Sequence, residues 1–201
     1  NGMKARLRRP LDFLVIADHA SNMGVMNGLE MKNTDILNSK NGKTFDLKLR
    51  EINKHLEADA KKAAYLSHQL HFDGLIKTVV RDDNFRQSIW KSIAVLADKH
   101  NDPGEFTAFI GYEWTSVRGH RVVVFKEDAD QVTQVIPFSR YDSDDPEKLW
   151  AFFGSYQKKT GGEVLAIPHN GNLSGGLMFA LEDAKGNSFS KDYAKIRSRW
   201  E

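Results

Sequence analysis

Short apolar runs alternate along the chain with longer stretches in which apolar residues recur among charged ones. An uninterrupted run of Leu, Ile, Val and Phe is typical of a buried strand, whereas apolar residues at helical spacing are typical of an amphipathic helix. The apolar runs lie at about residues 11–17, 106–114, 120–125 and 163–167. Because these strands alternate with helical stretches, the pattern predicts an α/β fold built from βα units.

Helices are predicted at residues 45–71 and about 84–100, where apolar positions follow helical spacing. A third helix is predicted to begin at residues 144–147, Asp-Asp-Pro-Glu, because an acidic cap followed by proline is typical of a helix start. The glycines at 161–162 are predicted to end it. Residues 20–44 are rich in Asn, Gly, Lys and Ser, which predicts a long, partly ordered loop.

The two apolar runs within residues 106–125 are separated by a short turn at 115–119, and this pattern predicts a β-hairpin. Glu113 lies near the end of the first predicted strand, and His120 begins the second. If the hairpin register pairs these residues across the turn, their side chains share one face of the sheet and could hold one metal ion. Taken alone, the pair also fits a surface Glu and a turn His.

Two further histidines lie where an apolar run ends. His19 follows Ile-Ala-Asp, and His169 lies within Ile-Pro-His-Asn-Gly-Asn. Asp18 is either a further ligand or the acceptor that orients a ligating imidazole. Because residues at strand ends emerge at one end of a sheet, we expect His19, Glu113, His120 and His169 to gather into a metal site.

The composition narrows the chemistry of such a site. The 201 residues include no cysteine, so a metal must be held by His, Asp and Glu, a donor set that suits Zn, Mn or Fe alike. With 40% hydrophobic residues the chain is long enough for one sizeable core, and we expect residues 1–201 to form a single domain. A net charge of only +2 does not indicate a nucleic-acid partner.

No apolar stretch of the sequence approaches the roughly 18 residues of a membrane span, and residues 1–10 do not form a signal peptide. We therefore expect no membrane partner. The sequence leaves the compartment open between cytoplasm and periplasm.

The succession LDFLVIADH, FIGYEWTS, HRVVVF, PFSRYDSDDPEKLW and VLAIPHNGNLSGGLMF resembles the PHP superfamily, named for polymerase and histidinol phosphatase. Within it, the chain resembles a bacterial branch catalogued as domain of unknown function 3604. The resemblance covers residues 11–20 and 106–199 and is loose over 21–105. It implies part of a distorted (β/α)7 barrel that holds two or three divalent metals at the C-terminal ends of its strands.

The resemblance also implies roles for single residues. Glu113 matches the carboxylate that bridges two metals and would be the central catalytic residue, while Asp18 or Asn170 would orient water or substrate. The metal ligands that it implies are His19, Glu113, His120 and His169. The family's opening His-x-His and closing Asp-x-His motifs do not occur in the chain, so we expect these residues to be the middle of a longer protein, incomplete at both ends.

We therefore expect the full-length protein to be a metal-dependent hydrolase, most simply a phosphoesterase that acts on a small phosphorylated substrate. In the isolated fragment one metal position would survive, formed by Glu113, His120 and His169, and we expect the fragment to be inactive. The alternative is a non-catalytic module, derived from the same barrel, that binds a ligand or a partner. Open strand edges in an incomplete barrel would favour a homodimer.

Overall fold

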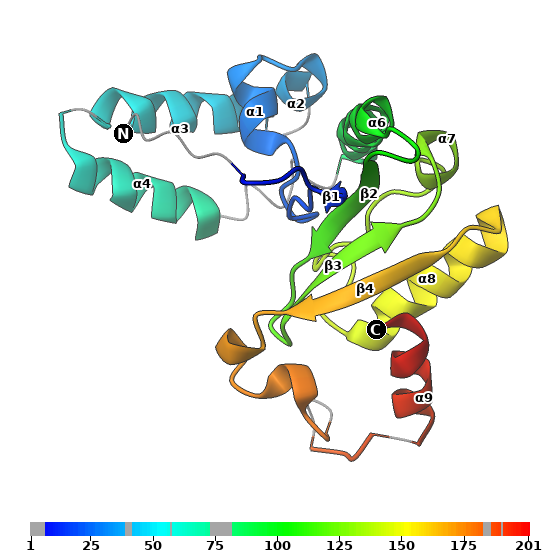
Figure 1. Ribbon diagram of the computed structural model, residues 1–201. Helices are drawn as coiled ribbons and strands as arrows, with labels where there is room; N and C mark the ends of the chain where they lie inside the picture. The colour runs from blue at the N-terminus through cyan, green and yellow to red at the C-terminus, as the bar shows by residue number, and fades with distance from the viewer. Residues whose placement is uncertain (1–6, 39–41, 57, 73–81, 183–185, 190) are drawn as a thin grey trace.

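The computed structural model describes residues 7–38, 42–56, 58–72, 82–182, 186–189 and 191–201. Its centre is a sheet of four strands in the order β1-β2-β3-β4 (Figure 1). β1 pairs parallel with β2, and the pairs β2–β3 and β3–β4 are antiparallel. The C-terminal ends of β2 and β4 therefore lie at the same edge of the sheet as the first residue of β3. The strands are β1 (Phe13–Val15), β2 (Thr107–Trp114), β3 (His120–Phe125) and β4 (Val164–His169).

Helices pack against one face of this sheet and bury an aromatic core. Trp90 of helix α6 and Trp150 of helix α8 lie in this core together with Tyr112 of β2. The C-terminal helix also contributes to it through Trp200. The helices around the core are α6 (Asp83–His100), α7 (Ala129–Val132), α8 (Pro146–Thr160) and α9 (Lys191–Trp200).

The two faces of the sheet differ because side chains alternate along each strand. In β2, Ile110, Tyr112 and Trp114 face the helices and are buried. In β4, Leu165 and Ile167 point to the opposite face and are exposed. The helices thus cover one face of the sheet and leave the other, largely apolar face accessible.

Several predicted elements are confirmed, including the mixed α/β fold, the hairpin and the helix at residues 84–100. Helix α8 begins as predicted, because the Asp145 side chain accepts a hydrogen bond of 3.0 Å from the backbone N–H of Glu147 and Pro146 is the first helical residue. It ends at Gly161, which adopts the left-handed conformation with φ of 73°. Strand β1 is shorter than the predicted run at 11–17.

The loop predicted at residues 20–44 is wrong. This segment contains α1 (Val25–Glu30), α2 (Thr34–Asn38) and the start of α3 (Gly42–His55). The Asn33 side chain accepts a hydrogen bond of 3.3 Å from the backbone N–H of Ile36, and Ile36 is fully buried. Here asparagine begins a short helix, whereas its frequency had indicated a loop.

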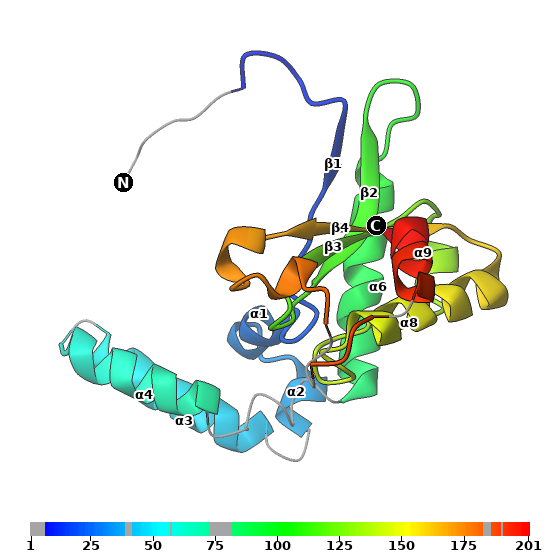
Figure 2. The same ribbon diagram turned by 90° about the horizontal axis from the view of Figure 1, so that it is seen from below.

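The single helix predicted at residues 45–71 is also wrong, because two helices occupy this stretch. Helix α3 ends at His55 and α4 (Ala60–Phe72) follows. The Asp59 side chain accepts a hydrogen bond of 3.0 Å from the backbone N–H of Lys62, so it begins a new helix instead of continuing the first one. The two helices lie side by side and extend away from the sheet (Figures 1 and 2).

A second, smaller core joins these helices to the rest of the chain. It contains Phe45 and Ile52 of α3 together with Ala63 of α4, and Phe85 from the start of α6. Among the described residues, no helix is both long enough and apolar enough to cross a membrane. The strands that the structure describes form an open sheet and do not close into a barrel.

Gly111 of β2 allows β1 to pack closely on the sheet. A Cβ atom at this position would lie 2.5 Å from the Val123 carbonyl oxygen and 2.5 Å from Cγ2 of Val15. We expect Gly111→Ala to lower the free energy of unfolding by about 1–3 kcal/mol, as overpacking against backbone does. Urea unfolding followed by tryptophan fluorescence measures this change.

The matched control is Gly154→Ala within α8, where an added Cβ would meet nothing within 4 Å. Alanine is favoured over glycine in a helix, so we expect this variant to gain about 0.5–1 kcal/mol. Loss of stability in both variants alike would contradict the close approach of β1 to Gly111.

Candidate metal centre

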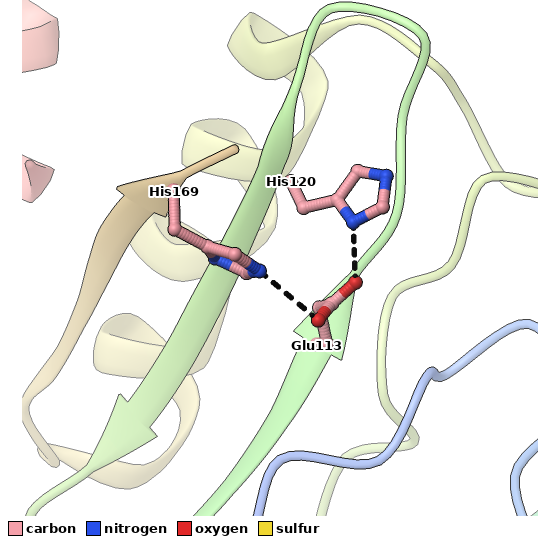
Figure 3. Close-up of side chains that lie close together, drawn as sticks. All are labelled: Glu113, His120 and His169. Atoms are coloured by element: carbon pink, nitrogen blue, oxygen red, sulfur yellow. Dashed lines mark hydrogen bonds and ion pairs between the residues drawn. The ribbon is translucent and has the colours of Figure 1, made fainter. Parts of the chain in front are cut away.

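Three side chains converge at the edge of the sheet where β2 and β4 end and β3 begins (Figure 3). Glu113 is next to last in β2, His120 is first in β3 and His169 is last in β4. His120 pairs directly with His169, whereas Glu113 pairs with Val122 and not with His120. Because residues two apart in a strand share a face, Glu113 and both histidines still lie on one face, the one that the helices leave accessible.

Glu113 lies at the centre of this group. Its Oε1 atom is 2.7 Å from Nδ1 of His120, and its Oε2 atom is 3.1 Å from Nε2 of His169 (Figure 3). The side chain of Glu113 is 12% exposed, and those of His120 and His169 are 28% and 31% exposed. The group is therefore sheltered but open enough for a small molecule to reach it.

His19 contacts the same carboxylate from the other side. It forms an isolated parallel bridge with Glu113, which extends the pairing of β1 with β2 beyond the end of β1. Nδ1 of His19 lies 3.2 Å from Oε1 of Glu113, and its side chain is 52% exposed. The structure thus places all three predicted histidines around Glu113, with His19 as the most exposed.

Thr115 is a functional candidate that the sequence analysis did not identify. Its hydroxyl donates a hydrogen bond of 3.1 Å to Oε1 of Glu113 and is also hydrogen-bonded to Nδ1 of His19. If the hydroxyl donates to the carboxylate, then it accepts from Nδ1–H of His19, which leaves the Nε2 lone pair of that ring free for a ligand. Its position two residues after Glu113 is the signal that could have indicated it, because the two side chains share a face.

Asn170 and Asp18, the two other residues predicted for the site, differ in their position relative to Glu113 and the histidines. Asn170 adopts a left-handed conformation with φ of 61°, and its Nδ2 atom is 3.4 Å from Nδ1 of His120. Asp18 accepts a backbone hydrogen bond of 2.8 Å from the N–H of Glu113 through its own carbonyl. Asp18 lines two cavities beside α6, and His19 lines one of them as well.

Tyr112 precedes Glu113 but does not belong to the centre. Burial raises the pKa of its hydroxyl far above the usual range of tyrosine. The hydroxyl oxygen accepts a hydrogen bond of 3.2 Å from the backbone N–H of Phe138, on the helix side of the sheet. Tyr112 is therefore a neutral core residue and not an acid or base of the site.

The donor set of Glu113, His120 and His169 fits a divalent cation. One ligand atom from each of the three side chains lies within 4.8 Å of the others. Two imidazoles and one carboxylate form a common set in catalytic zinc sites, where a further position is left for water or substrate. Manganese and iron are bound by the same types of ligand. The residues present could thus hold one metal ion.

Comparison with known proteins gives one match. The model of a family described as protein of unknown function (DUF3604) matches residues 1–201. Comparisons with curated proteins and with solved structures found no match. The match agrees with the narrower of the two resemblances seen in the sequence. The chain belongs to the DUF3604 family.

Proposed function

We propose that the full-length protein is a metal-dependent phosphoesterase whose metal centre includes Glu113, His120 and His169. The observation that carries this proposal is the convergence of two imidazole nitrogens on one sheltered carboxylate at the end of the sheet. A divalent cation at such a centre would lower the pKa of a bound water and offset the charge that develops on phosphoryl oxygens.

The residues of the chain have distinct tasks in this proposal. Glu113 supplies the anionic ligand, and the two histidines supply neutral ligands on either side of it. Thr115 keeps the carboxylate in place through its hydrogen bond to Oε1. Asn170 lies beside His120 at the mouth of the site and would orient a substrate there.

We also propose that the sheet is part of a larger PHP-type β/α barrel, in which His19 belongs to a second metal position. A contiguous apolar patch that is exposed on a protein surface usually marks a place where something else packs. In this sheet Phe13, Leu165 and Ile167 are exposed on the face opposite the helices, as expected if further strands close a barrel around it. The placement of the site at strand ends also agrees with barrel enzymes, whose chemistry lies at the C-terminal face.

The experiment is elemental analysis of the full-length protein together with a phosphoesterase assay. We expect about one equivalent or more of Zn, Mn or Fe per chain, and hydrolysis of p-nitrophenyl phosphate that a chelator abolishes and the metal restores. In His169→Ala the metal content and the hydrolysis should fall together. The matched control is His100→Ala at the end of α6, which should retain both.

Two results would contradict the proposal. Absence of metal from the full-length protein, even after incubation with each of the three cations, would exclude the metal centre. Bound metal without hydrolysis of any phosphoester would instead favour a module that binds a ligand at the same site.

A further inference from the structure

A small pocket lies directly beside the metal centre. Its volume is about 240 Å³, and its wall includes His120, so one candidate metal ligand belongs to both. Asn170 also lines it and lies 3.4 Å from the ring of His120. The volume is below the range of about 300–1,000 Å³ that is usual for drug-sized ligands, so it suits a small group. We call this the hairpin pocket; the lining residues that matter here are Thr115, Val117, His120, Arg140, Asn170 and Leu173.

Arg140 gives the hairpin pocket a positive charge. The described residues that line the pocket include no Asp or Glu. Arg140 is exposed, and within the part of the chain that the structure describes, no carboxylate forms an ion pair with it. A guanidinium group presents several N–H donors in one plane and binds phosphate or carboxylate through two parallel hydrogen bonds. An exposed arginine beside a candidate metal ligand is therefore suited to an anion.

The loop that carries Arg140 is held in place by its neighbours. Oδ2 of Asp142 accepts hydrogen bonds from the backbone N–H of Ser139, at 2.7 Å, and from its hydroxyl, at 2.9 Å. The same oxygen lies 3.5 Å from Arg86, and the Ser139 hydroxyl accepts from the backbone N–H of Tyr141. The nearest acidic neighbour of Arg140 in sequence is thus engaged elsewhere, and the backbone on both sides of Arg140 is fixed before any ligand arrives.

The two serines of the pocket wall are already hydrogen-bonded. The Ser116 hydroxyl donates to the carbonyl of Asp144 at 2.9 Å and accepts from the N–H of Arg118. The Ser174 hydroxyl donates to the carbonyl of Gly171 at 2.8 Å and accepts from the N–H of Met178. These hydroxyls shape the wall, so recognition of an anion falls to Arg140, with Asn170 beside it.

Two apolar side chains complete the wall. Val117 in the hairpin turn is 59% exposed, and Leu173 in the short helical turn after β4 is 78% exposed. A ligand that contacts them would remove apolar surface from water. The pocket thus combines one cation with an apolar surface, a combination that suits an anionic group attached to an apolar one.

We propose that the hairpin pocket binds the phosphoryl group of the substrate through Arg140 and its apolar leaving group against Val117 and Leu173. This inference rests on the proposed phosphoesterase activity and narrows the substrate to monoesters of apolar alcohols or phenols. Esters of strongly polar alcohols are poor substrates, because they gain nothing from the apolar part of the wall.

The first test measures binding of inorganic phosphate to the full-length protein by titration calorimetry, with the metal bound and in the presence of EDTA. We expect Arg140→Gln to raise the Kd for phosphate at least about tenfold and Arg140→Lys to restore part of the affinity. The Kd for the metal should stay unchanged in both. The matched control is Arg118→Gln in the hairpin turn between β2 and β3, because Arg118 lies over the ring of Phe189 and does not line the pocket.

The second test compares p-nitrophenyl phosphate with O-phosphoserine as substrates. We expect Leu173→Ser to lower kcat/KM for the aromatic ester about tenfold and to leave that for the polar ester nearly unchanged. Unchanged phosphate affinity in Arg140→Gln, or equal loss for both esters in Leu173→Ser, would overturn the inference while hydrolysis in the wild type upheld the proposed function. Phosphate binding through Arg140 in a protein that never binds metal would instead uphold the anion site and overturn the proposed function.

Discussion

Glu113→Gln is expected to remove most of the stabilisation that a divalent cation would give to the folded protein. In the wild type, a cation at one hundred times its Kd is expected to raise the free energy of unfolding by about 2.7 kcal/mol, because it binds the folded state alone. Glu113 contacts both His120 and His169, and it is the one anionic donor of the three. We expect its loss to raise the Kd for the cation at least about 100-fold. At the same concentration of cation, only about 0.4 kcal/mol would remain.

Urea unfolding followed by tryptophan fluorescence, with Zn or Mn and with EDTA, measures this difference. The matched control is Glu163→Gln, which changes an exposed carboxylate that pairs with Lys126 just before β4, at the opposite end of this strand from His169. Its stabilisation by the cation should equal that of the wild type. Glutamine keeps the shape of the side chain, so both variants should fold when metal is absent. Full stabilisation of Glu113→Gln would show that the cation binds elsewhere.

The sequence predicted which residues reach the site because each lies at the end of an apolar run. Glu113, His120 and His169 all lie at or next to the end of a strand, and parallel or hairpin pairing brings such ends to one edge. The register itself was not predictable, because it depends on the geometry of the turn at 115–119. Thr115 was missed because it was assigned to that turn, although its spacing of two residues from Glu113 places the two side chains on one face.

Helices could be predicted where their start and stop signals are local, and could not where contacts with distant residues decide the structure. Helix α8 has its start and stop signals within a few residues, so it was predictable. The segment 20–44 was not, because asparagine is typical both of loops and of helix starts, and burial of Ile36 in the second core decides between them. Helix α9 was not predicted either, and its place against the sheet depends on a contact between residues far apart in the chain.

That contact is a buried ion pair between Arg121 of β3 and Glu201 after α9. Nε of Arg121 lies 2.9 Å from Oε1 of Glu201, and their side chains are only 1% and 3% exposed. The same oxygen accepts a hydrogen bond of 3.1 Å from Nε1 of Trp150, and Oε2 lies 2.9 Å from Nε of Arg197. Arg121 also donates through Nη1 to two carbonyls of the hairpin turn, at 3.0 and 3.1 Å. One guanidinium therefore joins α9 to the sheet and fixes the turn that precedes His120.

Arg121→Met is expected to lower the free energy of unfolding by about 3–5 kcal/mol, because two carbonyls lose their donor and the buried carboxylate of Glu201 loses one of its two arginine partners. Urea unfolding measures this loss. The control is Arg199→Met at an exposed position of helix α9, which should change the free energy of unfolding by only about 0.5 kcal/mol. In the double variant Arg121→Met with Glu201→Met the loss should be smaller than the sum of the two single losses, since no uncompensated charge remains between them. Additive losses, or a loss in Arg121→Met no larger than in Arg199→Met, would contradict the buried pair.

Because the same guanidinium fixes the turn before His120, we also expect the affinity for the metal to fall in Arg121→Met, which couples the position of α9 to the metal centre.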